Sequence, residues 1–124
     1  MSFRFTEAFV AIATVNFEEL VDFYVQLFAQ KPSIYIPNSY AEFQVSNLKL
    51  GIFKPKESHV CEFNDSFKSH MSLCLEVNDL ESAMDHLESL GHPPFGEITN
   101  ASHGREIYAY DLDGNRIILY QSYK

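Results

Sequence analysis

Few side chains in this sequence are of types that could do chemistry, and most of them stand on segments with strand character. His70 could act as a general base or hold a ligand by a hydrogen bond, and it could equally be a histidine half in water at a strand end. Arg116, near Tyr120, could recognise a carboxylate, or it could pair with Asp113 or Glu7. These residue types favour binding of an organic molecule and define no reaction.

Three further candidates have simpler explanations. His59 and Cys61 could bind a soft metal, but no second pair lies nearby, and we interpret them as part of a solvated loop. Arg105, in a predicted loop before a strand, could clamp an acidic ligand, although surface charge is the better interpretation. Cys61 and Cys74 lack a paired-ligand spacing, so we expect them to remain thiols.

Length and charge restrict the class of protein. A chain of 124 residues is one ordinary domain, and we assign residues 1–124 to it. Seventeen acidic against nine basic side chains give a formal charge of -8, which repels phosphate backbones and anionic headgroups. We therefore expect neither a nucleic-acid nor a membrane role. The first residues contain no long apolar core, so we expect a cytoplasmic protein.

An internal repeat sets the organisation, with copies at residues 15–24 and 77–86. In each copy an asparagine follows an apolar strand and a glutamate stands three residues later, which is the pattern of a capping box. The pairs are Asn16 with Glu19 and Asn78 with Glu81. Apolar residues then recur at spacings of three and four, so two helices with one buried face each are predicted.

Each predicted helix is preceded by one strand and followed by three. The later strands are expected at residues 33–37, 40–45 and 48–53 in the first half, and at 97–99, 106–110 and 116–122 in the second. This predicts an α+β chain with module one at about 7–54, a linker or mobile flap at 55–69, and module two at about 70–123.

Strand alternation divides the side chains between two faces. The residues expected to pack on the helices are Val10, Ile12, Thr14, Leu50, Ile52, Met71, Leu73, Leu75, Val77, Ile117 and Leu119. Those expected on the opposite face are Phe9, Ala11, Ala13, Lys49, Gly51, Phe53, His70, Ser72, Cys74, Arg116, Ile118 and Tyr120. Since this second set is too apolar to face water, we expect the two faces to curve around a cleft.

Three short motifs, in this order, carry a resemblance to a known family. They are Asp22-Phe23-Tyr24, Val77-Asn78-Asp79-Leu80 and Asp111-Leu112-Asp113-Gly114-Asn115. With the two modules, they resemble the vicinal oxygen chelate superfamily, which includes glyoxalase I, extradiol dioxygenases, and fosfomycin and bleomycin resistance proteins. The resemblance implies two βαβββ modules forming a curved mixed sheet around a cleft. It also implies a homodimer, which would cover open sheet edges.

For mechanism, the resemblance implies a divalent ion that acts as a Lewis acid beside two substrate oxygens. The four ligand places of the family fall on Phe9, Gly51, Ser72 and Ile118. Phenylalanine, glycine and isoleucine side chains offer no donor atom, and a serine hydroxyl is a poor ligand for the metals concerned. A shift by two residues brings Glu7 and His70 to matching places, but it does not complete a shell.

We therefore expect a metal-independent protein that binds a small organic molecule and needs no cofactor. The expected ligand-binding residues are Phe9, Phe53, His70, Ser72, Arg116, Ile118 and Tyr120. One alternative is a metal-dependent lyase, isomerase or dioxygenase that uses Glu7 and His70. Another is a dimerisation or regulatory module whose cleft is filled by its own side chains.

Overall fold

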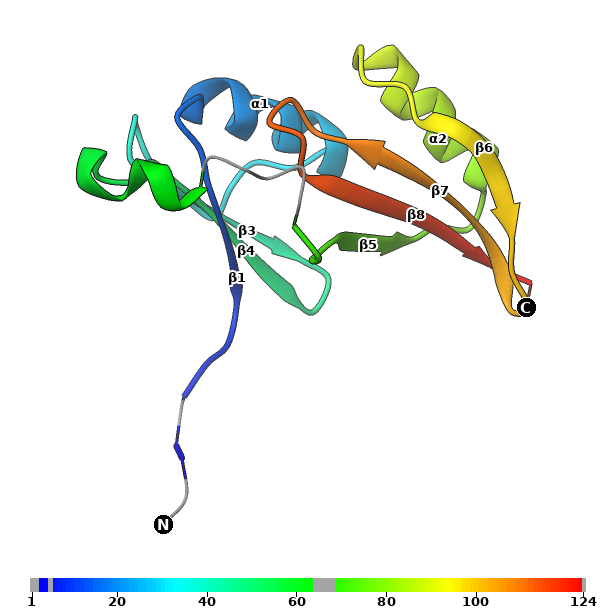
Figure 1. Cartoon of the computed structure of the whole chain (residues 1–124), viewed down its shortest axis with the longest axis horizontal. Helices are drawn as coiled ribbons and strands as arrows, with labels where there is room; N and C mark the ends of the chain where they lie inside the picture. Colours follow the sequence, from blue (N-terminus) through cyan, green and yellow to red (C-terminus); the bar gives the residue numbers. More distant parts are fainter. Residues whose placement is uncertain (1–2, 5, 64–68, 124) are drawn as a thin grey trace. The chain divides into compact units, whose positions relative to one another are not determined.

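The computed structural model describes residues 3–4, 6–63 and 69–123, and it divides the chain into two compact units, Met1–Cys61 and Glu62–Lys124 (Figure 1). Both units run strand, helix, strand, strand, strand, which confirms the predicted order. The boundary falls inside the expected linker. That linker contains a 3-10 helix, η1, at Glu57–Phe63, which the sequence analysis missed, and its residues 64–68 lie outside the described ranges.

Unit 1 is a four-stranded sheet with one helix against it. Its elements are β1 (Val10–Ala13), α1 (Phe17–Phe28), β2 (Ile34–Ile36), β3 (Tyr40–Val45) and β4 (Leu48–Phe53). The strand order is β1-β4-β3-β2, with β1 parallel to β4 and the other pairs antiparallel. The parallel pair requires a crossover connection, which α1 and the β2–β3 hairpin supply.

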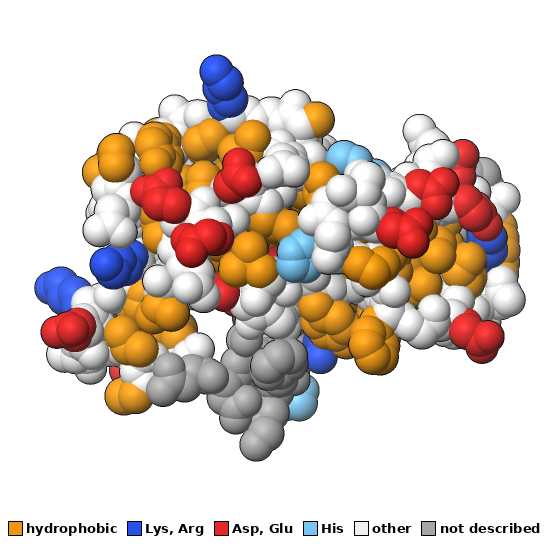
Figure 2. Space-filling model, turned by 90° about the horizontal axis from the view of Figure 1, so that it is seen from above, with side chains coloured by type: hydrophobic (Ala, Val, Ile, Leu, Met, Phe, Trp, Pro, Cys, Tyr) orange, Lys and Arg blue, Asp and Glu red, His pale blue; other side chains and the backbone are white. Residues whose placement is uncertain are grey.

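Unit 2 repeats this plan. Its elements are β5 (Leu73–Glu76), α2 (Leu80–Ser89), β6 (Phe95–Asn100), β7 (Gly104–Tyr110) and β8 (Arg116–Ser122). The order β5-β8-β7-β6 again makes the first and last strands parallel neighbours. No helix within the described ranges is long and apolar enough to span a membrane. Acidic side chains are scattered among apolar ones on the surface drawn in Figure 2.

The apolar stripe of each helix packs on its own sheet. In unit 1, Leu20 and Tyr24 are fully buried, as are Phe43 and Leu50 on the strands. Leu80, Leu87, Ile117 and Leu119 form the corresponding core of unit 2. Full burial of one such side chain contributes about 2 kcal/mol. The predicted alternation is confirmed at the buried Thr14, Leu50, Ile52, Ile117 and Leu119. Val10 is 37% exposed, and Met71 is 71% exposed because β5 begins only at Leu73.

The two capping boxes predicted from the sequence do not form as expected. Asn16 precedes α1 as expected, but its side chain makes no capping hydrogen bond. In unit 2 the cap is Asp79 rather than Asn78, and its carboxylate accepts from the Ser82 amide at 3.1 Å. Glu81 does not reach back along the helix because its carboxylate is bound to a guanidinium on β7.

The Asp111–Asn115 motif forms a tight turn between β7 and β8. Asp111 is only 4% exposed, and its Oδ1 accepts from the amides of Asp113 and Asn115 at 2.9 and 3.0 Å. Gly114 follows with φ 85°, a conformation that favours glycine. A buried carboxylate thus fixes the turn before Ile118.

Candidate functional site

Each sheet has an outer face, defined here as the face opposite the helix of its own unit. The strand register places the four predicted ligand positions at equivalent points of the two outer faces. Val10 pairs with Leu50 and Leu73 with Ile117, so Phe9 in unit 1 corresponds to Ser72 in unit 2. By the same register, Gly51 corresponds to Ile118.

These four positions do not fit a divalent metal ion. Three carry no donor atom, and the hydroxyl of Ser72 accepts a hydrogen bond from Arg116 Nη1 at 3.0 Å. Gly51 is covered by Tyr40, since a Cβ built at Gly51 would lie 3.0 Å from the Tyr40 hydroxyl. Among residues 3–4, 6–63 and 69–123, no three His, Cys, Asp or Glu side chains are grouped to hold a metal.

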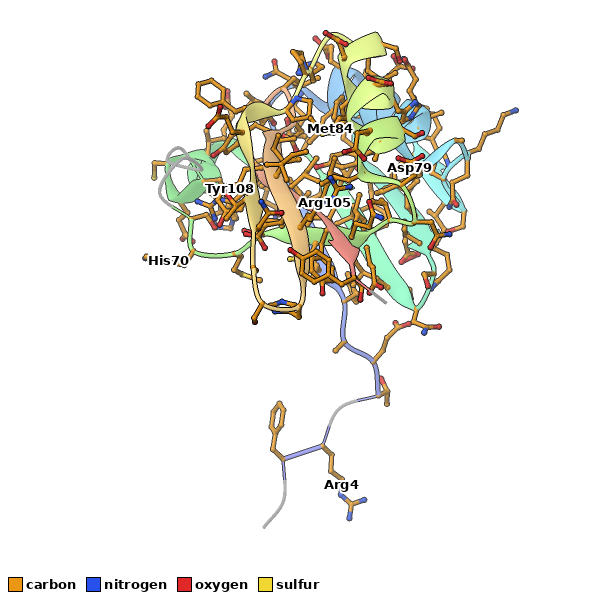
Figure 3. All side chains as sticks on the ribbon, turned by 90° about the vertical axis from the view of Figure 1, so that its right-hand side faces the viewer. Arg4, His70, Asp79, Met84, Arg105 and Tyr108 are labelled. Carbon is orange, nitrogen blue, oxygen red and sulfur yellow. The ribbon has the colours of Figure 1, made fainter. Side chains whose placement is uncertain are left out.

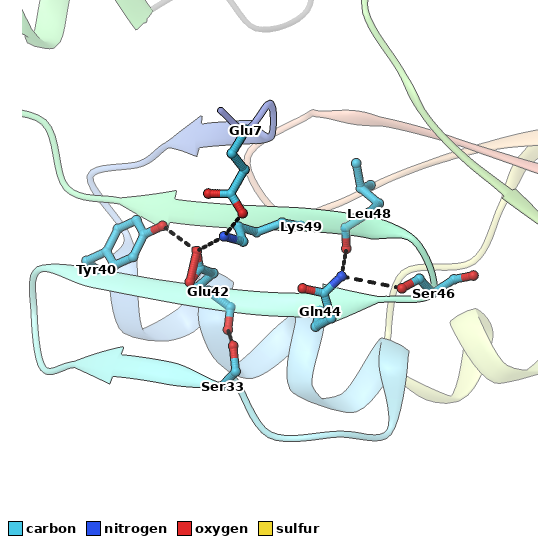
Figure 4. A network of polar contacts seen from close by, with 8 residues as sticks. All are labelled: Glu7, Ser33, Tyr40, Glu42, Gln44, Ser46, Leu48 and Lys49. Atoms are coloured by element: carbon cyan, nitrogen blue, oxygen red, sulfur yellow. Dashed lines mark hydrogen bonds and ion pairs between the residues drawn. The ribbon is translucent and has the colours of Figure 1, made fainter. Parts of the chain in front are cut away.

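The outer face of unit 1 carries an ionic network around Lys49 (Figure 4). The ammonium group is paired with Glu7 and lies 3.5 Å from Glu42 Oε2. The Tyr40 hydroxyl donates to the same Glu42 oxygen at 3.3 Å. The ring centroid of Phe9 lies 5.5 Å from Lys49 Nζ, a cation–π distance. The Phe9 ring is therefore a neighbour of the ionic network.

Protonation reinforces the network. The hydrogen bond from Lys49 to Glu7 raises the pKa of the ammonium group, so the lysine stays charged. Burial, followed by the nearby Glu42 carboxylate, raises the pKa of Tyr40, so its hydroxyl remains a donor. Glu42 is only 8% exposed and has both partners in place. The polar groups of this face thus satisfy one another.

The outer face of unit 2 is built around Arg116. Its Nη1 donates to Ser72 Oγ and, at 3.3 Å, to the carbonyl of Ser69. Both acceptors are neutral, and Arg116 forms no ion pair in the part of the chain that the structure describes. The expected alternative pairing with Asp113, in the same unit, is therefore wrong, and the pairing with Glu7 of unit 1 stays a prediction.

Aromatic side chains lie beside this arginine. Tyr110 pairs with Arg116 across the β7–β8 ladder, and Tyr108 pairs with Ile118. Tyr108 is 41% exposed, and Phe95, its partner on β6, is 78% exposed. The Phe95 and Tyr110 rings meet edge to face with centroids 6.5 Å apart. Unit 2 therefore presents accessible aromatic surface next to a cation.

Tyr120 is held away from Arg116 at the other end of β8. Its hydroxyl donates to the His103 carbonyl at 3.0 Å. The ring crosses Gly104 so closely that a Cβ there would lie 2.5 Å from Tyr120 Cε1. Glu76 and Glu106 flank Tyr120 on the neighbouring strands.

The remaining predicted residues are placed as follows. Phe53 ends β4 beside Ala13 and Tyr40, on the outer face of unit 1. His70 is exposed before β5 and extends away from the strands (Figure 3). The seven predicted ligand-binding residues thus divide between the units, two in the first and five in the second. A cleft that uses both sets stays a prediction.

Arg105 is a correction to the sequence analysis, which placed it in a loop. It is the second residue of β7, and alternation turns it to the helix side with Ile107 (Figure 3). Its two Nη atoms donate to both Glu81 oxygens at 2.8 and 2.9 Å, and Nη2 also donates to Gln121. This pair lowers the pKa of Glu81 to about 2. Arg105 therefore joins α2 to its sheet.

Two features of the outer faces were missed by the sequence analysis. Glu42 stands between buried Ala41 and Phe43, so alternation alone places its carboxylate on the outer face. Its proximity to Lys49 depends on the β3–β4 register, which sets Glu42 opposite Gly51. The cross-strand position of Glu106 beside Tyr120 depends on the β7–β8 register in the same way.

One hollow of unit 1 lies on the helix side, away from these faces. It has a volume of about 330 Å³ and lies between α1 and β2, with Val21, Val25 and Pro32 among its lining residues. At its rim Tyr35 donates to Glu18 at 2.5 Å, and this hydrogen bond raises the pKa of Tyr35.

Comparison with known proteins identifies the fold. No family model matches the chain, and no curated protein matches it by sequence. Among solved structures, a glyoxalase/bleomycin resistance protein from Catenulispora acidiphila DSM 44928 is 22% identical, with TM-score 0.67 over 92% of this chain and 96% of that one. The fosfomycin resistance protein FosX from Listeria monocytogenes is 16% identical, with TM-score 0.73 over 97% and 95%.

A glyoxalase-related enzyme from Fulvimarina pelagi gives TM-score 0.75 at 18% identity, over 95% of this chain and 89% of that one. These similarities cover nearly the whole chain and include both units. The chain has the fold of the glyoxalase/bleomycin resistance proteins, the vicinal oxygen chelate fold that its motifs resemble.

Proposed function

We propose that the protein binds a small organic molecule on the outer face of unit 2 and needs no divalent metal ion to do so. The observation that carries this proposal is the exposed aromatic surface of Phe95 and Tyr108 beside Arg116, whose hydrogen bonds among the described residues go to neutral acceptors. Aromatic surface next to one directional polar group is typical of ligand sites. Within the predicted set, Ser72, Arg116, Ile118 and Tyr120 would supply most contacts.

Phe9, Phe53 and His70 stay predicted ligand-binding residues. No reaction follows from binding alone.

The metal-dependent alternative has weaker support. One FosX structure is described as a complex with Mn(II) and sulfate, so a protein of this fold can hold a metal. In this chain the four corresponding positions lack suitable donors, and Glu7 would first have to leave Lys49. A lyase, isomerase or dioxygenase built on Glu7 and His70 would therefore need ligands from elsewhere.

Thermal-shift screening tests the proposal. The purified protein would be heated with a library of small organic compounds and, separately, with Mn²⁺, Zn²⁺, Ni²⁺ and Fe²⁺. We expect at least one organic compound to raise the melting temperature, because a ligand that binds only the folded state stabilises it. Stabilisation by a divalent ion, with none by any organic compound, would overturn the proposal.

Elemental analysis of protein purified without chelator tests the alternative directly. We expect less than stoichiometric metal. Stoichiometric Fe, Mn, Ni or Zn that His70→Ala abolishes would favour the metal enzyme.

We further propose that two chains form a homodimer. The edge strand β2 exposes Ile34, Tyr35 and Ile36 at 46%, 46% and 52%, and open edges with apolar side chains favour association. Light scattering after size-exclusion chromatography should give twice the 14.3 kDa chain mass, and a monomer at micromolar concentration would contradict it.

A further inference from the structure

We infer that the molecule bound by unit 2 is a flat aromatic monocarboxylate, with its carboxylate on Arg116. This inference rests on the proposed function and adds the chemical class of the ligand. It follows from the unused donors of the Arg116 guanidinium, the apolar surface beside it, and the carboxylates of Glu76 and Glu106 at the far end of the same face.

Arg116 is anchored and only partly engaged. In the described residues its hydrogen bonds are made by Nη1 alone, to Ser72 Oγ at 3.0 Å and to the Ser69 carbonyl at 3.3 Å. A guanidinium has five N–H donors in a fixed plane, and two adjacent donors match the oxygens of a carboxylate. The remaining edge of Arg116 can therefore take an acid group without breaking its existing contacts.

The surface beside Arg116 suits a flat apolar body. Ile118 is the next β8 residue on the same face, about 7 Å along the strand. Tyr108 stands opposite Ile118, and the exposed Phe95 stands beside Tyr108. Aromatic rings favour offset or edge-on packing against other rings. A ligand with one or two fused rings would span this distance with its acid group on Arg116.

The far end of the face disfavours a second acid group. Glu76 and Glu106 flank Tyr120, whose Cα lies four residues and about 13 Å from that of Arg116. Neither glutamate forms an ion pair among the described residues. Their charges would repel the distal end of a dicarboxylate that lay along β8, and they would orient a monocarboxylate toward Arg116.

Calorimetric titration with 1-naphthoate and 1-naphthamide tests this inference, because the two probes share their rings and differ in charge. The proteins would be the wild type, Arg116→Gln, Arg116→Lys and Lys54→Gln in low-salt buffer at pH 7. Lys54 is exposed on unit 1 and provides a control with the same change in net charge. Circular dichroism would establish that each variant is folded.

We expect the wild type to bind naphthoate about tenfold more tightly than naphthamide, the effect of one charge-assisted hydrogen-bonded pair. Arg116→Gln should abolish this preference, because it should weaken naphthoate binding much more than naphthamide binding. Arg116→Lys should retain part of it, and Lys54→Gln all of it.

Equal binding of the two probes by the wild type, or loss of preference in Lys54→Gln as well, would overturn the carboxylate inference while leaving the proposed binding function standing. If neither probe binds at millimolar concentration and the compound library also gives no stabilisation, both fail. If the library stabilises the protein but neither probe binds, only the inference fails.

Discussion

The outer faces of the two units share one scaffold and treat their central cation in opposite ways. Lys49 and Arg116 occupy equivalent positions. Lys49 precedes Leu50, which pairs with Val10, and Arg116 precedes Ile117, which pairs with Leu73. Lys49 lies between the carboxylates of Glu7 and Glu42, whereas the hydrogen bonds of Arg116 among the described residues go to a hydroxyl and a carbonyl. A duplicated module can therefore pair its central cation with carboxylates on one face and with neutral acceptors on the other.

The difference originates on the third strand of each module. Opposite Gly51 stands Glu42, and opposite the equivalent Ile118 stands Tyr108. In unit 1 the missing side chain of Gly51 also makes room for Tyr40, which donates to Glu42. The outer face of unit 1 is thus filled by its own side chains. The sequence analysis offered this arrangement as one alternative for the whole cleft.

The largest effect on the free energy of unfolding is expected when a methyl group is added at Gly104, next to the Tyr120 ring. The matched change in unit 1 is at Gly51, next to Tyr40. In Gly104→Ala the new Cβ would lie 2.5 Å from both the Gln121 carbonyl oxygen and the Tyr120 ring, so backbone must move. We expect a loss of about 3 kcal/mol in the free energy of unfolding. In Gly51→Ala only the end of the Tyr40 side chain must shift, and we expect about 1 kcal/mol. Urea denaturation measures both, and equal losses would contradict the difference.

Removal of the buried carboxylate tests whether unit 1 is internally satisfied. Glu42→Ala leaves the Tyr40 hydroxyl without its acceptor and takes a near neighbour from Lys49, so we expect a loss of about 2 kcal/mol. The matched change Glu7→Ala removes a solvent-exposed partner of the same lysine and should cost much less. If both variants are as stable as the wild type by urea denaturation, the network does not stabilise the face.

The free energy of unfolding, measured as a function of pH, distinguishes Arg105, which is paired with Glu81, from Arg116, which has no ion pair among the described residues. The pKa of Glu81 falls from 4.5 to about 2 in the folded chain, so its contribution is present above pH 4.5 and is lost as the pH falls toward 2. Arg105→Gln should therefore destabilise the protein at neutral pH, and its difference from the wild type should shrink over that range. A difference independent of pH would show that the ion pair is not its cause.

The smallest effect on stability is expected at Arg116. Because no carboxylate is paired with it among the described residues, Arg116→Gln should change the free energy of unfolding by about 0.5 kcal/mol or less. A large loss in urea denaturation would mean that Arg116 holds the fold together, and its role in ligand recognition would lose its basis.

Local sequence patterns predicted much of the fold. The repeat gave the two modules, and alternation placed Leu50, Ile52, Ile117 and Leu119 in the cores. The same alternation placed Gly51 and Ile118 on the opposite face, where the family resemblance implies two of the four metal-ligand places.

Contacts that depend on register between strands were not predictable from single segments. Tyr40 reaches Gly51, and Glu42 reaches Lys49, only because β3 and β4 pair in one register. Arg105 was misplaced because β7 begins two residues earlier than its apolar pattern suggests, which turns the guanidinium to Glu81.

Chemical-shift mapping is the most direct test of the central claim that the ligand binds on the outer face of unit 2. A ¹⁵N-labelled sample titrated with 1-naphthoate should show shifts in the amide signals of Ser72, Tyr108, Arg116 and Ile118. The signals of Tyr40, Glu42 and Lys49 should stay in place. Shifts centred on those three residues, or no shift in either unit at millimolar ligand, would contradict the account.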